Sequence, residues 1–393
     1  MPKKLLNNII LNKTKLTTSI YIHIPFCKQA CHYCDFHFST SMKKKDEMVL
    51  ALAKELEMRK SEFEGECVET IYFGGGTPSI LEILDIKFLI NAVYENYNVS
   101  ENPEITLEAN PDDLDSEKIM QFASSPINRL SIGIQSFFEE DLKMMNRAHN
   151  ATEALKCLKD ATRYFDNISV DLIYGIPGMT NEKWTKNIEN ALRFGIPHIS
   201  SYALTVEPKT ALKKLIETGK IIKPKDDVAS EHFDILVKIL EKNGFIHYEL
   251  SNFGKKNYFS KNNSSYWLGK KYIGIGPSAH SFNTYSRSWN SSNNAIYLKA
   301  IQNNMLPNEI EILSITDKYN EYVMTGLRTM WGISLDKVAN EFGTEYQNYL
   351  LKNAKKFVND GLLLIDNKVL KTSQKGKFLS DGLASDLFML NLE

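Results

Sequence analysis

The chain has few cysteines, little net charge and no long apolar run, and each shortage excludes a class of protein. Its 393 residues hold five cysteines, an odd number without a disulfide framework, which predicts a reducing compartment and a cytoplasmic protein. The net charge of −1 gives no overall electrostatic footprint for nucleic acid. No apolar run approaches the ~18 residues of a membrane span, and the lysine-containing start lacks a signal-peptide pattern. Cys67 and Cys157 lie in apolar segments and are predicted to be buried structural residues.

The other three cysteines follow one strand-like run, Ile20–Phe26. Cys27, Cys31 and Cys34 have the spacing C-x3-C-x2-C. Three thiols cannot all pair with one another, and structural zinc sites usually use two separated C-x2-C pairs. Iron–sulfur cubanes are held by cysteine thiolates, normally four, so three cysteines would leave one iron free to bind an outside molecule. Taken alone, the cysteines are also compatible with a zinc-binding loop.

Strand-like and helix-like segments alternate along the first half of the chain. Six runs rich in Ile, Leu, Val, Tyr and Phe predict buried parallel strands, namely Ser19–Phe26, Thr70–Phe73, Glu104–Ala109, Arg129–Gln135, Asn167–Tyr174 and His198–Val206. The amphipathic stretches between them predict helices, namely Met42–Phe63, Ser79–Asn96, Asp115–Phe122, Thr152–Tyr164 and Asn181–Arg193. This alternation predicts an α/β fold with right-handed crossovers. Six units predict a partial (β/α)6 TIM-like barrel, short of the eight units of a closed one.

The rest of the chain predicts further barrel segments and a second, smaller domain. A helix is expected at Asp226–Asn243, and short strands are expected at His247–Phe253 and Tyr272–Ser278. The Asn-rich stretch 290–307 has weak periodicity and indicates a change of domain. We therefore expect an N-terminal extension (1–18), a barrel with its extension strands (19–289) and a C-terminal domain (308–393).

The C-terminal domain has a helical pattern followed by a hairpin. Helices are expected at Asp317–Met330, Leu335–Phe342 and Glu345–Asp360, and the hairpin strands at Leu362–Ile365 and Lys368–Thr372. This order predicts a small α+β, winged-helix-like domain. It lacks a dense Lys/Arg stripe on a recognition helix, so we expect a packing or lid role and no nucleic-acid partner.

Polar and glycine-rich groups recur at the ends of the predicted strands, where such barrels place their active sites. Gly74–Pro78 follows the second strand, and glycines let the backbone approach a ligand closely. Glu108 ends the third strand, where a carboxylate is costly unless paired or solvated. Arg147 suits bidentate binding of a carboxylate, and Asp171 is the least expected charge among its apolar neighbours. Any one of these residues could have a purely structural role. Their shared position at the strand ends indicates a ligand site.

The cysteine spacing resembles that of the radical S-adenosylmethionine (SAM) enzymes, in which the open iron of a [4Fe–4S] cluster binds the amino and carboxylate groups of SAM. The flanking residues are similar to one family among them, the oxygen-independent coproporphyrinogen III oxidases and the related HemW-type haem chaperones. These residues are Tyr21, His23, Pro25, Phe26, Tyr33, Asp35 and Phe36. The resemblance covers residues 19–280 and, less specifically, the C-terminal domain. It implies that the cluster passes one electron to SAM, which is cleaved.

The same resemblance implies roles for individual residues. The metal ligands would be Cys27, Cys31 and Cys34. The SAM contacts would be Gly75, Gly76 and Thr77 at the methionine end, Arg147 at the carboxylate, Gln135 at the nucleoside, Asp171 at the ribose, Tyr33, Ala203 and His280 near the adenine, and Tyr21 and Glu108 elsewhere on SAM.

Two departures from the oxidase pattern favour the chaperone branch. The oxidases carry a fourth cysteine two residues after the third, where this chain has Phe36, and they have a longer N-terminal extension. The Cys34-Asp35-Phe36 pattern resembles the chaperones, which bind haem and deliver it to acceptor proteins. We therefore predict a haem chaperone, with a haem acceptor protein and an electron donor to the cluster as partners.

The chaperone branch also has a haem-binding signature, His-Asn-x-x-Tyr-Trp. Here Asn263, Tyr266 and Trp267 match it and are assigned to haem, but Asn262 replaces the histidine. An amide is a poor ligand for haem iron compared with imidazole, so haem would need another ligand. His247 and His280 flank the segment.

Two other functions are compatible with these residues. One is a radical SAM enzyme acting on a porphyrin or another substrate, as an oxidase or a methyltransferase would. The other is a non-catalytic haem carrier with a structural cluster. Release of 5′-deoxyadenosine from SAM separates the enzyme from the carrier.

Overall fold

The computed structural model describes residues 17–390. The predicted N-terminal extension, 1–18, and the residues that bear on a signal peptide lie outside this range, except for Thr17 and Thr18, which begin β1. Within the described residues, none of the helices combines the length and the apolar composition that a membrane crossing needs.

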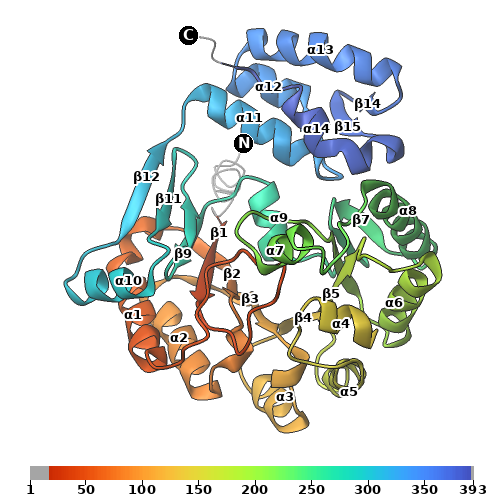
Figure 1. Cartoon of the computed structure of the whole chain (residues 1–393). Helices are drawn as coiled ribbons and strands as arrows, with labels where there is room; N and C mark the ends of the chain where they lie inside the picture. Colours follow the sequence, from red (N-terminus) through yellow and green to blue (C-terminus); the bar gives the residue numbers. More distant parts are fainter. Residues whose placement is uncertain (1–16, 391–393) are drawn as a thin grey trace, which may run out of the picture.

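Six parallel strands form the centre of a twelve-stranded sheet in the described part of the chain. They are β1 (Thr17–Ile24), β2 (Cys67–Gly75), β3 (Val99–Ala109), β4 (Arg129–Gln135), β5 (Ile168–Tyr174) and β6 (His198–Ala203). They neighbour one another in sequence order, and every adjacent pair is parallel. This arrangement confirms the predicted partial barrel of six β/α units (Figure 1).

Additional strands extend both edges of these six. At one edge lie β8 (Asn252–Gly254) and β7 (Ile246–Glu249), and at the other lie β9 (Tyr272–Ile275), β10 (His280–Phe282), β11 (Ser286–Asn290) and β12 (Asn308–Ile312). β9 is parallel to β1, whereas β10, β11 and β12 continue antiparallel. The single strand expected at His247–Phe253 is a hairpin, because the Glu249 carboxylate accepts a hydrogen bond from the Ser251 amide and the chain turns there.

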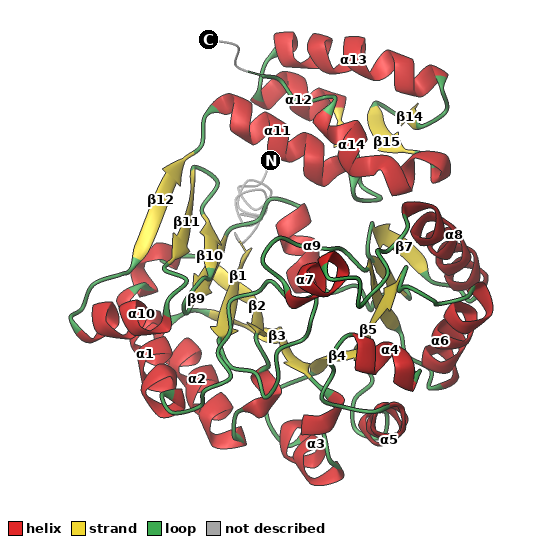
Figure 2. Cartoon of the chain, in the orientation of Figure 1, coloured by secondary structure: helices red, strands yellow, loops and turns green. Residues whose placement is uncertain are grey.

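Helices surround the parallel strands, as Figure 2 shows. They are α1 (Lys45–Met58), α2 (Ile83–Asn96), α3 (Ser116–Ala123), α4 (Glu139–Met144), α5 (Ala151–Ala161), α6 (Asn181–Arg193), α7 (Ala211–Glu217), α8 (Asp226–Lys242), α9 (Lys261–Trp267) and α10 (Asn294–Gln302). The strands are apolar because they are covered on both faces; every residue of β4 is buried. Cys67 and Cys157 are buried free thiols, as predicted.

The stretch 290–307 continues the barrel domain. Its helix α10 buries Tyr297, Leu298 and Ile301 in the barrel's core, and the Tyr297 hydroxyl donates to Glu55 on α1. The following strand β12 pairs with β11 in the large sheet. The barrel domain therefore extends through residue 312, further than the limit of 289 that we expected from the weak local periodicity.

The C-terminal domain has its own apolar core. It contains α11 (Ile315–Leu327), β13 (Ile333–Ser334), α12 (Leu335–Glu341), α13 (Thr344–Asn359), β14 (Leu363–Asp366), β15 (Val369–Thr372) and α14 (Ser380–Ser385). The three strands form a small sheet in the order β13-β15-β14, so helices followed by a hairpin are observed as predicted. This domain, blue in Figure 1, contacts the barrel through backbone hydrogen bonds of Leu250 to Arg328 and of Met330 to Tyr248.

Candidate cluster and SAM site

A cavity of about 420 Å³ lies at the carboxyl ends of the parallel strands and contains most of the predicted site residues. Its walls include all three cysteines of the triad and nine of the eleven residues assigned to SAM. These nine are Tyr33, Gly75, Gly76, Thr77, Glu108, Gln135, Arg147, Asp171 and Ala203. Residues from five different strands or strand-end loops therefore meet the cysteine loop in one place.

Backbone hydrogen bonds from distant segments hold the cysteine loop in position. The Cys27 amide donates to the Ser39 carbonyl at 3.1 Å, which closes the loop at its base. The His32 amide donates to the Met145 carbonyl at 3.0 Å, and the Leu212 amide donates to the His32 carbonyl at 2.7 Å. The loop is therefore pinned between the segment after α4 and the start of α7, with all three thiols half-buried.

Two side chains donate to sulfurs of the triad. The Thr77 hydroxyl lies 3.4 Å from the Cys27 sulfur, and the Arg147 guanidinium lies 3.3 Å from the Cys31 sulfur. Burial, together with the two neighbouring cysteines, raises the pKa of the Cys34 thiol to about 11. The two donors stabilise the thiolate form. A bound cation would do the same and so offset the cost of burying a thiolate. The donor set therefore fits a thiolate-held cluster.

The triad does not resemble a site for one metal ion. Across residues 17–390, no three His, Cys, Asp or Glu side chains are placed to share a single ion. In a cubane each thiolate binds a different iron, so the cysteines do not need to converge on one point. The arrangement of the three thiols is therefore compatible with a cluster, in which each sulfur reaches its own iron.

Arg147 connects the triad to the centre of the cavity. Its guanidinium donates to the Asn110 side chain at 2.6 Å and to the Gly133 carbonyl at 2.9 Å, and it lies 3.5 Å from the Tyr33 hydroxyl. Its buried Nε atom has no hydrogen-bond partner among the described residues. An unpartnered buried donor is costly. Because Arg147 lines the cavity, its positive charge is placed to attract an anionic group such as a carboxylate.

The glycine-rich loop after β2 lines the cavity with its amides already engaged. Gly75 donates to Glu108, Gly76 to the Ile24 carbonyl and Thr77 to the Phe26 carbonyl. Gly76 cannot be replaced, because a Cβ there would lie 2.5 Å from the Phe26 carbonyl oxygen. With these amides engaged, the loop is poorly suited to bind an anion, which needs free donors.

Two carboxylates occupy the interior of the cavity. Burial raises the pKa of Glu108 to about 7, although Glu108 accepts hydrogen bonds from the Tyr72 hydroxyl at 2.8 Å and the Gly75 amide at 3.2 Å. Burial also raises the pKa of Asp171 to about 6. Near neutral pH Glu108 is therefore partly protonated and Asp171 is mostly ionised, so the cavity carries negative charge that favours a cationic ligand.

Gln135 ends β4 in an unusual backbone conformation. Its φ of 64° lies in the left-handed region, which costs a non-glycine residue roughly 1–3 kcal/mol. Such strain is often found at ligand sites, and Gln135 lines the cavity as the sequence predicted. Asn110 and Tyr202 also line this cavity, and Tyr72 donates to Glu108 from within β2. The sequence did not lead us to assign these three, although the strand-end positions of Asn110 and Tyr202 are a signal that could have found them.

The two remaining SAM candidates, Tyr21 and His280, lie in a second cavity of about 450 Å³. This cavity adjoins the first one, since Asp35 and Phe36 line both. It also contains His37, a residue that the sequence gave no reason to select. Tyr21 and His280 therefore line a cavity beside that of the other nine candidates, and Tyr21 lies near Glu108 at the border between the two.

The residues of the haem signature have different surroundings on α9. Asn262 is buried, and its side chain accepts a hydrogen bond from the Thr70 hydroxyl at 2.9 Å. Tyr266 faces the second cavity and packs edge-on against Tyr272. The Asn263 backbone amide donates to the capping Ser260 hydroxyl, and Trp267 lies under the guanidinium of Arg328 at the C-terminal domain. Of the three assigned residues, Tyr266 lines the second cavity and the other two do not.

Comparisons with known proteins agree with this geometry. Residues 21–191 match the radical SAM superfamily, and residues 313–379 match the HemN C-terminal domain. The chain is 34% identical over 361 residues to the heme chaperone HemW of Lactococcus lactis, covering 91% of this chain and 94% of that protein. It is 31% identical over 367 residues to heme chaperone HemW of Bacillus subtilis, covering 92% and 97%. Its fold is similar to that of Escherichia coli coproporphyrinogen III oxidase (HemN), with a TM-score of 0.83, 21% identity and coverage of 99% and 94%.

Proposed function

The chain belongs to the family of the HemW heme chaperones, and on that premise we propose that it binds a [4Fe–4S] cluster and SAM and carries haem to an acceptor protein. Haem is its cargo in this proposal. The partners would be a haem acceptor and a donor of electrons to the cluster, and the compartment would be the cytoplasm.

One observation carries the proposal: the three cysteines share a cavity with side chains that complement each charged group of SAM. The cysteines would hold three irons, leaving the fourth for SAM. Carbonyl oxygens of the glycine-rich loop would accept from the amino group, and the Arg147 guanidinium would bind the carboxylate. Gln135 and Asp171 would contact the nucleoside, with Tyr33 and Ala203 near the adenine.

When bound, the cluster supplies the electron that cleaves the sulfonium of SAM. The protein's own residues position the ligand and exclude water. Burial raises the pKa of Glu108 to about 7, so at neutral pH a part of the free protein carries a proton there, which would pass to solvent as a cationic ligand enters. Arg147 donates to the Cys31 sulfur, which would lower the negative charge on the cluster side of the cavity.

The residue at the fourth-cysteine position supports a carrier over an oxidase. Phe36 is 69% exposed and lines both cavities. An exposed phenyl ring at the border of two cavities is suited to stacking against a flat apolar ligand. It supplies no metal ligand, in keeping with the chaperone branch of the family.

Anaerobic reconstitution followed by haem titration tests the proposal. Iron and sulfide contents near four per chain are expected from a cubane, together with one bound haem and transfer of that haem to an apo-haemoprotein. Release of 5′-deoxyadenosine under reducing conditions is also expected, and it would exclude a carrier whose cluster is only structural. Purified protein that holds zinc, or that takes up no haem, would contradict the proposal.

A further inference from the structure

The second cavity has the composition of a haem pocket. It is lined by the aromatic rings of Tyr21, Phe36, Tyr266 and Tyr272 and by three imidazoles, those of His23, His37 and His280. Its volume of about 450 Å³ lies within the range of roughly 300–1,000 Å³ that is typical of small-molecule and cofactor sites. Aromatic walls suit a flat apolar macrocycle, and an imidazole is a common ligand of haem iron.

The position that carries the signature histidine in the family cannot hold the iron here. Asn262 is 1% exposed, and its backbone amide and side chain are bonded to Glu104 and Thr70. It does not line the second cavity. Replacing Asn262 by histidine is therefore not expected to strengthen haem binding.

His247, one of the two histidines flanking the signature, is also excluded. Its ring is buried and stacks on Phe253 with the centroids 4.1 Å apart. Both ring nitrogens have partners, since one lies 3.0 Å from the Leu250 carbonyl and the other 2.8 Å from the Lys377 ammonium. No lone pair on this ring is available to a metal.

His280 has both properties that an iron ligand needs, namely access to the cavity and a ring nitrogen without a partner among the described residues. Its side chain is exposed at the cavity, and its ring forms no hydrogen bond within residues 17–390. By contrast, both nitrogens of the neighbouring His23 are engaged, one with the Tyr21 hydroxyl and one with the His37 carbonyl. One nitrogen of His37 is bonded to Asn294, so His280 is the least committed of the three imidazoles.

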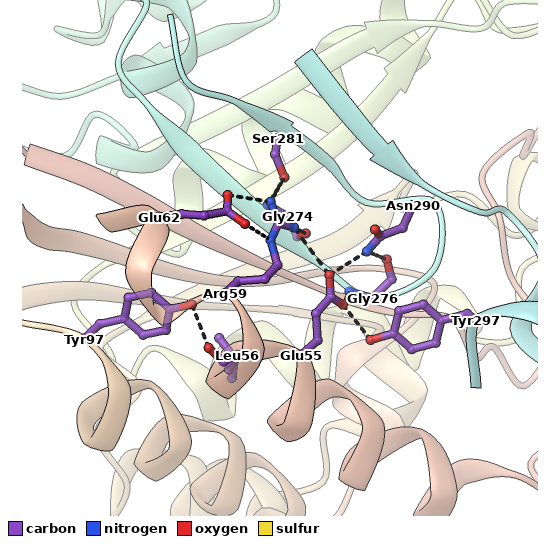
Figure 3. A network of polar contacts seen from close by, with 10 residues as sticks. All are labelled: Glu55, Leu56, Arg59, Glu62, Tyr97, Gly274, Gly276, Ser281, Asn290 and Tyr297. Carbon is purple, nitrogen blue, oxygen red and sulfur yellow. Dashed lines mark hydrogen bonds and ion pairs between the residues drawn. The ribbon is translucent and has the colours of Figure 1, made fainter. Parts of the chain in front are cut away.

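A buried polar network holds the turn that presents His280 (Figure 3). The Glu55 carboxylate accepts from the Gly276 amide at 2.8 Å, the Asn290 side chain at 2.8 Å and the Tyr297 hydroxyl at 2.6 Å. Arg59, also on α1, donates to the Gly274 carbonyl at 2.9 Å and to Ser281 at 3.1 Å. The segment on either side of His280 is thus fixed before any ligand arrives, which reduces the entropy cost of binding.

We infer that haem binds in this second cavity with His280 as the ligand of its iron. The inference rests on the proposed function, because haem is taken as the cargo. It assigns the iron ligand to a residue outside the signature segment, and it gives Tyr266 the role of a cavity wall. The exposed positions of Phe36 and His280 leave the haem accessible, as a carrier that must release its cargo requires.

Spectroscopic haem titration of the reconstituted full chain tests the inference. For His280→Ala we expect about tenfold or more weaker haem binding and loss of the histidine-ligated Soret and EPR signature. Added imidazole should restore that signature, which a merely structural role would not predict. Asn262→His should bind haem no more tightly than the wild type, because its position is buried.

The outcomes separate this inference from the proposed function. Wild-type protein that binds no haem would overturn both. A wild type that binds haem while His280→Ala keeps the same affinity and spectrum would overturn the inference alone, as would a gain in affinity by Asn262→His. Far-UV circular dichroism and cluster content, both expected to match the wild type, verify that His280→Ala is folded.

Discussion

The guanidinium of Arg147 lies 3.3 Å from the sulfur of Cys31, although the two residues are 116 positions apart in the chain. The contact joins the cysteine loop after β1 to the segment after β4, and the same guanidinium bonds to Asn110 and Gly133. One side chain therefore ties the proposed cluster to the wall that would bind the carboxylate of SAM.

Replacing Arg147 with glutamine should lower the reduction potential of the cluster. The substitution removes a positive charge and a hydrogen bond beside a cluster sulfur, and both favour the reduced, more negative state. An EPR-monitored redox titration measures the shift. Arg163→Gln is the control, since the side chain of Arg163 is 60% exposed; equal potentials in both variants and the wild type would contradict this role of Arg147.

Removing a cysteine of the triad should abolish the cluster. Cys31→Ala leaves only two thiolates, so we expect little or no iron and sulfide after anaerobic reconstitution. Cys157→Ala is the matched control, because Cys157 is a buried free thiol away from the triad and its loss should leave the cluster content unchanged. Normal iron content in Cys31→Ala would exclude the cluster assignment.

Glu108 should make the stability of the cluster-free protein depend on pH. Burial raises its pKa to about 7, whereas an unfolded glutamate titrates near ~4.3. Between these values the folded chain keeps a proton that the unfolded chain has lost. The contribution of Glu108 to the free energy of unfolding is therefore present at low pH and is lost as the pH rises towards 7.

Urea denaturation of the wild type and of Glu108→Gln at pH 5, 6, 7 and 8 measures this effect. The free energy of unfolding of the wild type, relative to that of the variant, should fall as the pH rises. A difference that stays constant over this range would show that the pKa of Glu108 is not raised.

The Tyr297 hydroxyl should contribute measurably to stability. It donates to the buried Glu55 carboxylate at 2.6 Å, and loss of a hydrogen bond to a charged group costs about 2 kcal/mol. Tyr297→Phe should therefore lower the free energy of unfolding by about that amount, as measured by urea denaturation. Tyr285→Phe, at a 70% exposed position, should change it little; the same loss in both would argue against a specific bond.

Gly276 should tolerate no side chain. Its φ is +105°, and a Cβ there would lie 2.7 Å from the His23 carbonyl oxygen, so Gly276→Ala should cost about 3 kcal/mol. Gly269 is the matched control, because its φ is also positive at +66° but its Cβ would meet nothing within 4 Å. Gly269→Ala should cost only about 1 kcal/mol. Thermal denaturation of both variants compares them, and equal losses would rule out the predicted clash.

The barrel could be predicted from the sequence because its strands are buried on both faces and carry their own apolar pattern. β4 was expected at Arg129–Gln135 and is found there, and α6 was likewise expected at Asn181–Arg193. The triad and the residues at the strand ends were also identifiable, since parallel strands bring their carboxyl ends to one edge whatever the loops between them do.

The second cavity could not be predicted, because it depends on contacts between residues far apart in the chain. Tyr297 and Glu55 are 242 positions apart, and no local pattern links a tyrosine on α10 to a glutamate on α1. The burial of Asn262 was hidden for the same reason, as its partners Thr70 and Glu104 lie nearly 200 and nearly 160 residues earlier. Tertiary contacts of this kind determine which histidine is available, and a signature in one short segment does not record them.

Phe36 and Asp35 belong to the walls of both cavities. Haem in the second cavity and SAM in the first would both lie against these two residues. The two proposed binding sites therefore share a wall. Ligands that press on a common wall are coupled in free energy, and the coupling is reciprocal. If SAM changes the affinity for haem by some factor, haem must change the affinity for SAM by the same factor. The occupancy of one site would then report on the occupancy of the other.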